Sequence, residues 1–156
     1  TEFINTSIGI LEEQDFENGL SSKCQENGDN SENGKILIAS KMNPDKIYMT
    51  MVFANWCGPC KMAKPYYRSL SQLFNKHNIT SVRLTAIDAS EDSSIANSIC
   101  VRGYPTFLIW KDGKKKKYTG QRDVQSFVKA LAEHSNEVKE KLQALIKDAT
   151  VSDALA

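Results

Sequence analysis

The chain of 156 residues is long enough for one domain with a sizeable core, and its 40% hydrophobic and 25% charged residues are ordinary for a globular protein. A formal net charge of +1 gives no overall reason to expect nucleic acid as a partner, and no apolar run approaches the roughly 18 residues of a membrane span. The chain begins at Thr1 without methionine, so we expect a processed or trimmed product.

The first third of the chain is weakly patterned. A strand is predicted within residues 3–11, and apolar residues follow at near-helical spacing over 12–20. Residues 21–46 form a polar insertion. Its stretch 24–34 has no large apolar residue and is rich in Asn, Gly and Ser, so we expect a solvated loop. Residues 36–39 fit a short extra strand or a helical turn.

Regular patterning resumes at residue 47. A buried strand is predicted over 47–54, followed by a helix from Lys61 to about Asn75, which Pro65 should interrupt and kink. Residues 81–88 alternate as a strand does, and 91–99 fit a short helix.

The chain closes with a hairpin and a helix. Strands are predicted at 106–110 and 115–119 around a turn at Asp112–Gly113, and Asp123 caps the final helix. Alternating strands and helices indicate parallel strands, and the hairpin adds antiparallel ones. We therefore expect an α/β fold with a mixed central sheet and helices on both faces.

The most informative motif is Cys57-Gly58-Pro59-Cys60, which lies between a strand and a helix. Two cysteines at this spacing form a dithiol that can close into a disulfide and reopen. A helix beginning at Cys57 points N–H groups at its sulfur and favours the thiolate, the form that attacks disulfides. Cys60, one turn later, can resolve a mixed disulfide, and Lys61 adds positive charge.

The alternative for such a pair is half of a zinc site. Zinc requires four ligands, but Cys24 and Cys100 are far apart in the sequence and His77 and His134 are isolated. We therefore expect no metal and no bound organic cofactor.

With its surroundings, the motif resembles the active site of the thioredoxin family. The matching features, in the family's order, are Trp56–Lys61, Pro65, Ile87–Asp88, Arg102–Thr106, Lys111–Gly113 and Gly120. The resemblance covers about residues 3–134. We therefore expect a thioredoxin-like domain over 1–134, with the insertion at about 21–46, and a C-terminal helical extension over 135–156.

The resemblance implies a protein-disulfide reductase with Cys57 and Cys60 as its redox-active pair. Gly58-Pro59 resembles the reducing members, whereas oxidising or isomerising relatives usually carry His in the second position. The expected partners are protein disulfide substrates and a flavin- and NADPH-dependent electron donor of the thioredoxin-reductase type. Such a dithiol is compatible with cytosol, organelle or lumen. The substrate-binding residues implied are Trp56, Gly58, Pro59, Gly103, Tyr104 and Pro105, with Lys61 and Asp88 as supporting residues.

Pro105 should be a cis proline beside the dithiol, which leaves the backbone of Tyr104 free to pair with an extended substrate. The alternative is an ordinary trans proline that opens an edge strand. By the same resemblance, Trp56 should stack over the site and Asp88 should accept its indole proton.

Two positions depart from the family pattern. Met51 stands where the family often has a buried Asp, and about Leu84 where a Lys often accompanies it. A buried Met requires no polar partner, so we expect a stable protein in which the step at Cys60 relies on water and turns over more slowly.

Three features lie outside the family pattern. Cys100 is expected to be a packed thiol and Cys24 an exposed one, the alternative being a regulatory disulfide or dimer through Cys24. The lysines at 111 and 114–117 fit a solvated sheet edge, and less well an acidic partner or nucleic acid.

The C-terminal pattern favours one helix from Asp123 to about Ala149, because its small and apolar residues recur every three or four positions. Alternatively the chain bends near residues 134–136 and packs on its own domain, which we favour over a homodimer or a partner helix.

A different class of function is a binding module, in which a thioredoxin fold acts as an assembly subunit or holdase and the dithiol is secondary. The intact pair of cysteines argues against it.

Overall fold

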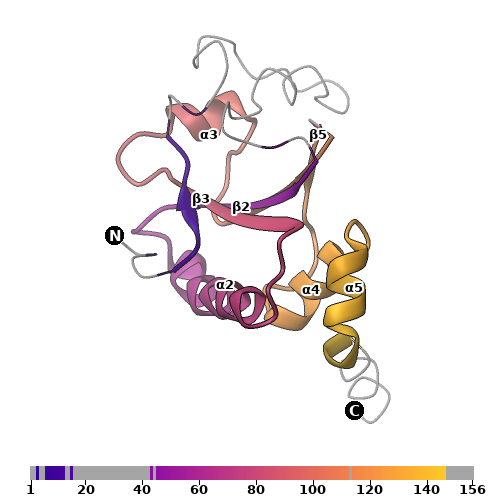
Figure 1. The fold of residues 1–156 in the computed structure, drawn as a ribbon. Helices are drawn as coiled ribbons and strands as arrows, with labels where there is room; N and C mark the ends of the chain where they lie inside the picture. The colour runs from indigo at the N-terminus through magenta and orange to yellow at the C-terminus, as the bar shows by residue number, and fades with distance from the viewer. Residues whose placement is uncertain are drawn as a thin grey trace.

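The computed structural model describes residues 3, 6–12, 15, 43, 45–112 and 114–146. Its centre is a five-stranded sheet with the order β1-β3-β2-β4-β5 (Figure 1). The strands are β1 (Gly9–Ile10), β2 (Ile47–Phe53), β3 (Val82–Asp88), β4 (Thr106–Lys111) and β5 (Lys114–Lys117). The first three are parallel, β4 runs antiparallel to β2, and β5 runs antiparallel to β4. The predicted mixed sheet is therefore confirmed.

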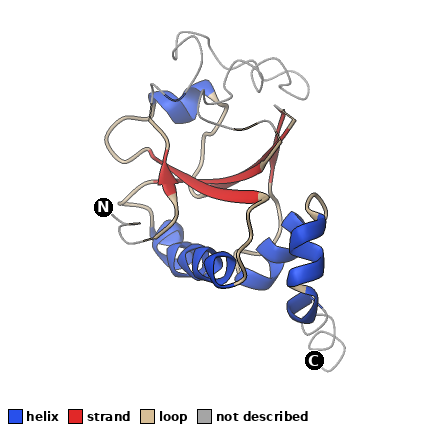
Figure 2. Cartoon of the chain, in the orientation of Figure 1, coloured by secondary structure: helices blue, strands red, loops and turns tan. Residues whose placement is uncertain are grey.

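Helices cover both faces of the sheet (Figure 2). They are α2 (Gly58–Lys76), α3 (Ser94–Ser98), α4 (Val124–Ala132) and α5 (Asn136–Lys141). The ribbon places α2 and α4 on one face and α3 on the other (Figure 1). Among the described residues, no helix is long and apolar enough to cross a bilayer.

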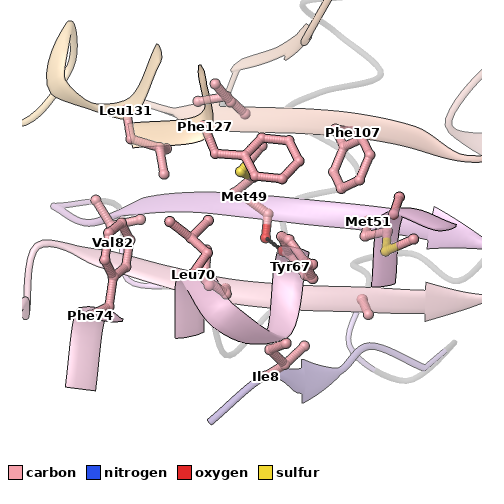
Figure 3. Packing of buried hydrophobic residues seen from close by; sticks show 14 of the residues in the cluster. Ile8, Met49, Met51, Tyr67, Leu70, Phe74, Val82, Phe107, Phe127 and Leu131 are labelled. Carbon is pink, nitrogen blue, oxygen red and sulfur yellow. Dashed lines mark hydrogen bonds between the residues drawn. The ribbon is translucent and has the colours of Figure 1, made fainter. Parts of the chain in front are cut away.

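The larger core fills the space between the sheet and helices α2 and α4, and its centre is aromatic (Figure 3). The rings of Phe107 and Phe127 are 4.9 Å apart, and Tyr67 packs against both. The Tyr67 hydroxyl lies 2.7 Å from the carbonyl oxygens of Met49 and Thr85, to which it donates. This contact fastens α2 to the two central strands.

A smaller core lies on the α3 face, where side chains such as Val52, Ile87 and Trp110 are buried. A chain of hydrogen bonds crosses this layer. The Trp110 indole N–H donates to the Thr50 hydroxyl at 2.9 Å, which lies 2.7 Å from the Thr85 hydroxyl. Buried polar groups are satisfied here, as a stable core requires.

Helix α2 is longer than predicted. It begins at Gly58, directly after Cys57 as the motif predicted, rather than with the apolar stretch from Lys61. It continues through Pro65 to Lys76, so the expected interruption is wrong. Two predictions lie outside the described residues: the helix over 12–20, of which only residues 12 and 15 are described, and the loop over 24–34.

The expectation of one long C-terminal helix is also wrong. Helix α4 ends at Ala132, and Ser135 caps α5 by accepting a hydrogen bond from the Val138 N–H at 3.2 Å. Val138 and Leu142 are buried in the larger core, so α5 packs on its own domain. The bend that we favoured over a partner helix is the one found.

Candidate active site

Cys57 occupies the N-cap of α2, shortly after β2 ends at Phe53. Its backbone is extended, and its sulfur accepts a hydrogen bond from the Cys60 N–H at 3.2 Å. Pro59 lies in the first turn, where its missing N–H costs nothing. The sequence thus places the first sulfur against the open end of a helix, where an N–H group stabilises negative charge on it.

The two thiols differ in their surroundings, and both are free. Cys57 retains 7% of its surface, whereas Cys60 has none. The pKa of Cys60 is raised to about 11, chiefly by burial and also by the hydrogen bond and charge of Cys57, while the Ala54 backbone and the charge of Lys64 act in the opposite direction. Cys60 is therefore a protonated thiol at neutral pH.

The loop before β4 packs against the dithiol. The Tyr104–Pro105 peptide bond is cis, as the resemblance implied. The Cys57 sulfur lies 3.3 Å from the Tyr104 carbonyl oxygen and donates to it. The Thr106 hydroxyl closes the loop by donating to the Gly103 carbonyl at 2.7 Å. The sulfur of Cys57, the cysteine expected to attack, and the loop expected to present substrate are therefore in contact.

Trp56 stands beside the site with 67% of its surface exposed. Its ring meets that of Tyr104 edge to face, with centroids 5.8 Å apart. The indole N–H donates to the Ser90 carbonyl at 3.3 Å, so the expectation that Asp88 accepts this proton is wrong. The reason is that the Asp88 carboxylate accepts from the N–H and hydroxyl of Ser90 instead, and so closes the turn after β3.

The two departures from the family pattern lie in the core. Met51 is fully buried and Leu84 nearly so, both in the larger core. Neither side chain can exchange a proton, so neither can act as a base for Cys60.

Lys64 was missed by the sequence reasoning. It lies one helical turn after Cys60, is only 2% exposed, and holds its ammonium 4.4 Å from the centre of the Phe53 ring. Its charge lowers the pKa of Cys60. The signal available in the sequence was the i, i+4 spacing from Cys60, which puts both residues on one helix face.

The surface next to the dithiol is partly apolar. Met62 and Tyr66 on α2 are exposed by 76% and 49%. With Pro59 they line a cavity of about 480 Å³, whose other wall is residues 120–123. Exposed apolar surface beside a reactive group is typical of an interaction site.

The expectation of a packed free thiol at Cys100 is wrong, because this residue is disulfide-bonded. Its backbone has a φ of 66°, a left-handed conformation that is uncommon outside glycine. Cys24 lies outside the described residues.

Comparison with known proteins agrees with this geometry. The sequence model of the thioredoxin family matches residues 35–133. The chain is 34% identical to protein disulfide-isomerase 1 of Caenorhabditis elegans over 102 residues, which are 63% of this chain and 21% of that protein. It is also 34% identical to thioredoxin of Oryctolagus cuniculus over 104 residues, which are 67% of this chain and 80% of that protein.

Two solved structures share the fold. Human ERp44 (form I) aligns with a TM-score of 0.57 at 20% identity, covering 83% of this chain and 30% of that one. The J-Trx1 fragment of ERdj5 aligns with a TM-score of 0.53 at 21% identity, covering 64% and 45%.

The fold and the Cys57–Cys60 dithiol define a thioredoxin-type domain. The chain belongs to the thioredoxin family. It spans about a fifth of the length of the first of its disulfide-isomerase relatives and most of the length of the thioredoxin.

Proposed function

We propose that the protein reduces disulfides in other proteins through Cys57 and Cys60. One observation carries the proposal: free thiols lie at the N-cap and in the first turn of α2, and the sulfur of Cys57, the less buried of the two, accepts the Cys60 N–H and touches the loop before β4.

The first step is attack by the Cys57 thiolate on one sulfur of a substrate disulfide. A bond forms between Cys57 and that sulfur, the substrate's S–S bond breaks, and the other substrate sulfur leaves as a thiolate. Cys57 is suited to this step because it is the more exposed of the two thiols. Trp56, Gly58, Pro59 and the 103–105 loop supply the surface that receives the substrate.

The second step is attack by Cys60 on the Cys57 sulfur, which releases the second substrate thiol and leaves a Cys57–Cys60 disulfide. Before the first step, the charge and hydrogen bond of Cys57 help to raise the pKa of Cys60. A bond between Cys57 and substrate removes the charge of Cys57, and with it one of the causes that raise the pKa of Cys60. Lys64 keeps its lowering effect throughout. A dithiol donor, of the thioredoxin-reductase type, then returns two electrons.

Two other functions are compatible with the fold. Several relatives carry the name disulfide-isomerase, and isomerisation would use the same Cys57. Reduction is favoured by Gly58-Pro59 between the cysteines, which gives the resolving thiol no histidine neighbour. A binding module would leave the arrangement of the thiols without a purpose.

Insulin reduction with a dithiol donor tests the proposal. We expect the wild type to reduce insulin repeatedly and Cys57→Ser to be inactive. Pro59→His should reduce insulin more slowly than the wild type but repair scrambled disulfides faster. If the wild type does not reduce insulin and no cysteine variant loses its binding to a partner, the protein is instead a binding module.

A further inference from the structure

The lysines of β5 are divided between the two faces of the sheet. Lys115 pairs with Trp110 and Lys117 with Leu108 across the β4–β5 ladder. Directly paired residues place their side chains on the same face. Because Trp110 and Leu108 belong to the smaller core, Lys115 and Lys117 lie on the α3 face. Lys114 and Lys116 therefore lie on the opposite face.

On the α3 face these two lysines line a cavity of about 530 Å³, whose other wall is the loop from Ile99 to Thr106. Arg102 and Arg122 also line it. We name this cavity the basic groove and define its charge by Arg102, Lys115, Lys117 and Arg122. The described residues that line it include no Asp or Glu.

Lys115 is held in an unfavourable state. Burial lowers its pKa, and among the described residues its ammonium has no hydrogen-bond partner. Removing a cation from water without a partner costs free energy, which an anionic ligand would offset. A solvated sheet edge, the first explanation of these lysines, does not account for a half-buried ammonium.

The basic groove and the candidate active site share the loop before β4. Tyr104 and Pro105 line the groove, and the Tyr104 carbonyl is 3.3 Å from the Cys57 sulfur. A substrate polypeptide that lies along this loop places its disulfide at Cys57. The residues that flank the disulfide then lie beside the groove.

We propose that the basic groove binds an acidic stretch of the substrate polypeptide that flanks the reacting disulfide. This inference rests on the proposed function and adds a class of substrate to it. The flank binds equally in the ground state and the transition state, so it lowers KM and leaves kcat unchanged.

The test compares two synthetic peptides with the same intramolecular disulfide, one flanked by Asp and Glu and the other by Asn and Gln. At low salt we expect the wild type to reduce the acidic peptide with a kcat/KM about tenfold higher, from charge pairs with the four cations of the basic groove. The preference shrinks as salt rises.

The matched variants are Lys115→Gln/Lys117→Gln and Lys114→Gln/Lys116→Gln, which remove the same charge from the same strand on opposite faces. The first is expected to reduce the preference to about twofold or threefold, through a lower kcat/KM for the acidic peptide. The second should keep the full preference. Equal kcat/KM for both peptides in the wild type, or equal losses in both variants, would overturn the proposal.

A second measurement separates this inference from the proposed function. Fluorescence anisotropy of a cysteine-free acidic peptide measures binding to the basic groove without any redox step. We expect weaker binding by Lys115→Gln/Lys117→Gln and unchanged binding by Lys114→Gln/Lys116→Gln, even if the protein reduces no disulfide. If the acidic peptide does not bind while a single-stranded oligonucleotide binds through the same two lysines, the occupant is nucleic acid and the proposal is wrong.

Discussion

Cys60 and Lys64 lie one turn apart on the buried face of α2, and their pairing is the main departure of this site from sequence expectation. Lysine is almost never fully buried, so its place on the core face could not be predicted from residue type. The Cys-Gly-Pro-Cys dithiol, by contrast, followed from a local motif, and the cis Pro105 from the resemblance to the thioredoxin family. The acceptor of the Trp56 proton did not, because it depends on the turn at Ser90.

At the same scale, Lys64→Met is expected to raise the pKa of Cys60, because it removes a positive charge that stabilises the thiolate. Thiolate absorbance followed against pH in a Cys57→Ser background measures this midpoint without interference from the other thiol. Lys61→Met, an exposed lysine on the same helix, is the control and should move the midpoint less. Equal midpoints in the Lys64→Met variant and its parent would contradict the role of Lys64.

Met51→Asp tests whether a buried acid is missing from the site. We expect several-fold faster reduction at neutral pH, together with a loss of stability of about 3 kcal/mol from burying a carboxylate. Met49→Asp, on the same face of β2 but farther from the dithiol, should lose similar stability without a gain in rate. Insulin reduction and thermal melts give both quantities, and an unchanged rate in Met51→Asp would refute the idea.

Besides the buried Val138 and Leu142, the carboxylate of Glu137 attaches helix α5 to the domain. Glu137 accepts hydrogen bonds from the Thr80 and Ser81 N–H groups at 2.8 and 2.9 Å and pairs with Lys141 at 3.1 Å. Partial burial by itself would raise the pKa of Glu137, but these hydrogen bonds outweigh it and hold the pKa at about 2. The apolar spacing runs unbroken past Ser135, so it could not reveal where α4 ends; the cap at Ser135 was the only local signal.

Glu137→Gln should destabilise the fold by about 2 kcal/mol at neutral pH, because charge-assisted hydrogen bonds are lost. The folded-state pKa of about 2 lies below the ordinary 4.5, so the ionised form stabilises the fold. The difference in the free energy of unfolding between wild type and variant is therefore at its maximum above about pH 4.5 and decreases as the pH falls toward 2. Urea melts across this range measure it. Glu140→Gln, an exposed residue of α5, should show no such fading.

For the molecule as a whole, the order of strands and helices predicted the mixed sheet, because alternation leaves few topologies open. The packing of the two faces was less predictable. The sequence gives no signal that the Tyr67 hydroxyl would donate to carbonyls of both β2 and β3. Nor does it show which faces of the sheet the alternate lysines of β5 would occupy.

Because Val138 and Leu142 are buried against their own domain, α5 offers little apolar surface to a second copy. We therefore expect a monomer. Small-angle scattering over a range of protein concentrations should give a constant molecular mass near 17.4 kDa. A mass that doubles with concentration would contradict this expectation, and persistence of the doubling in a Val138→Asp variant would place the dimer contact elsewhere.

The central claim, that Cys57 attacks and Cys60 resolves, is tested most directly by trapping the mixed disulfide. Cys60→Ser and Cys57→Ser are each incubated with a disulfide peptide, and adducts are located by mass spectrometry after digestion. We predict a stable adduct on Cys57 in the Cys60→Ser variant and little or none on Cys60 in the Cys57→Ser variant. Equal adducts on the two cysteines would contradict the division of roles.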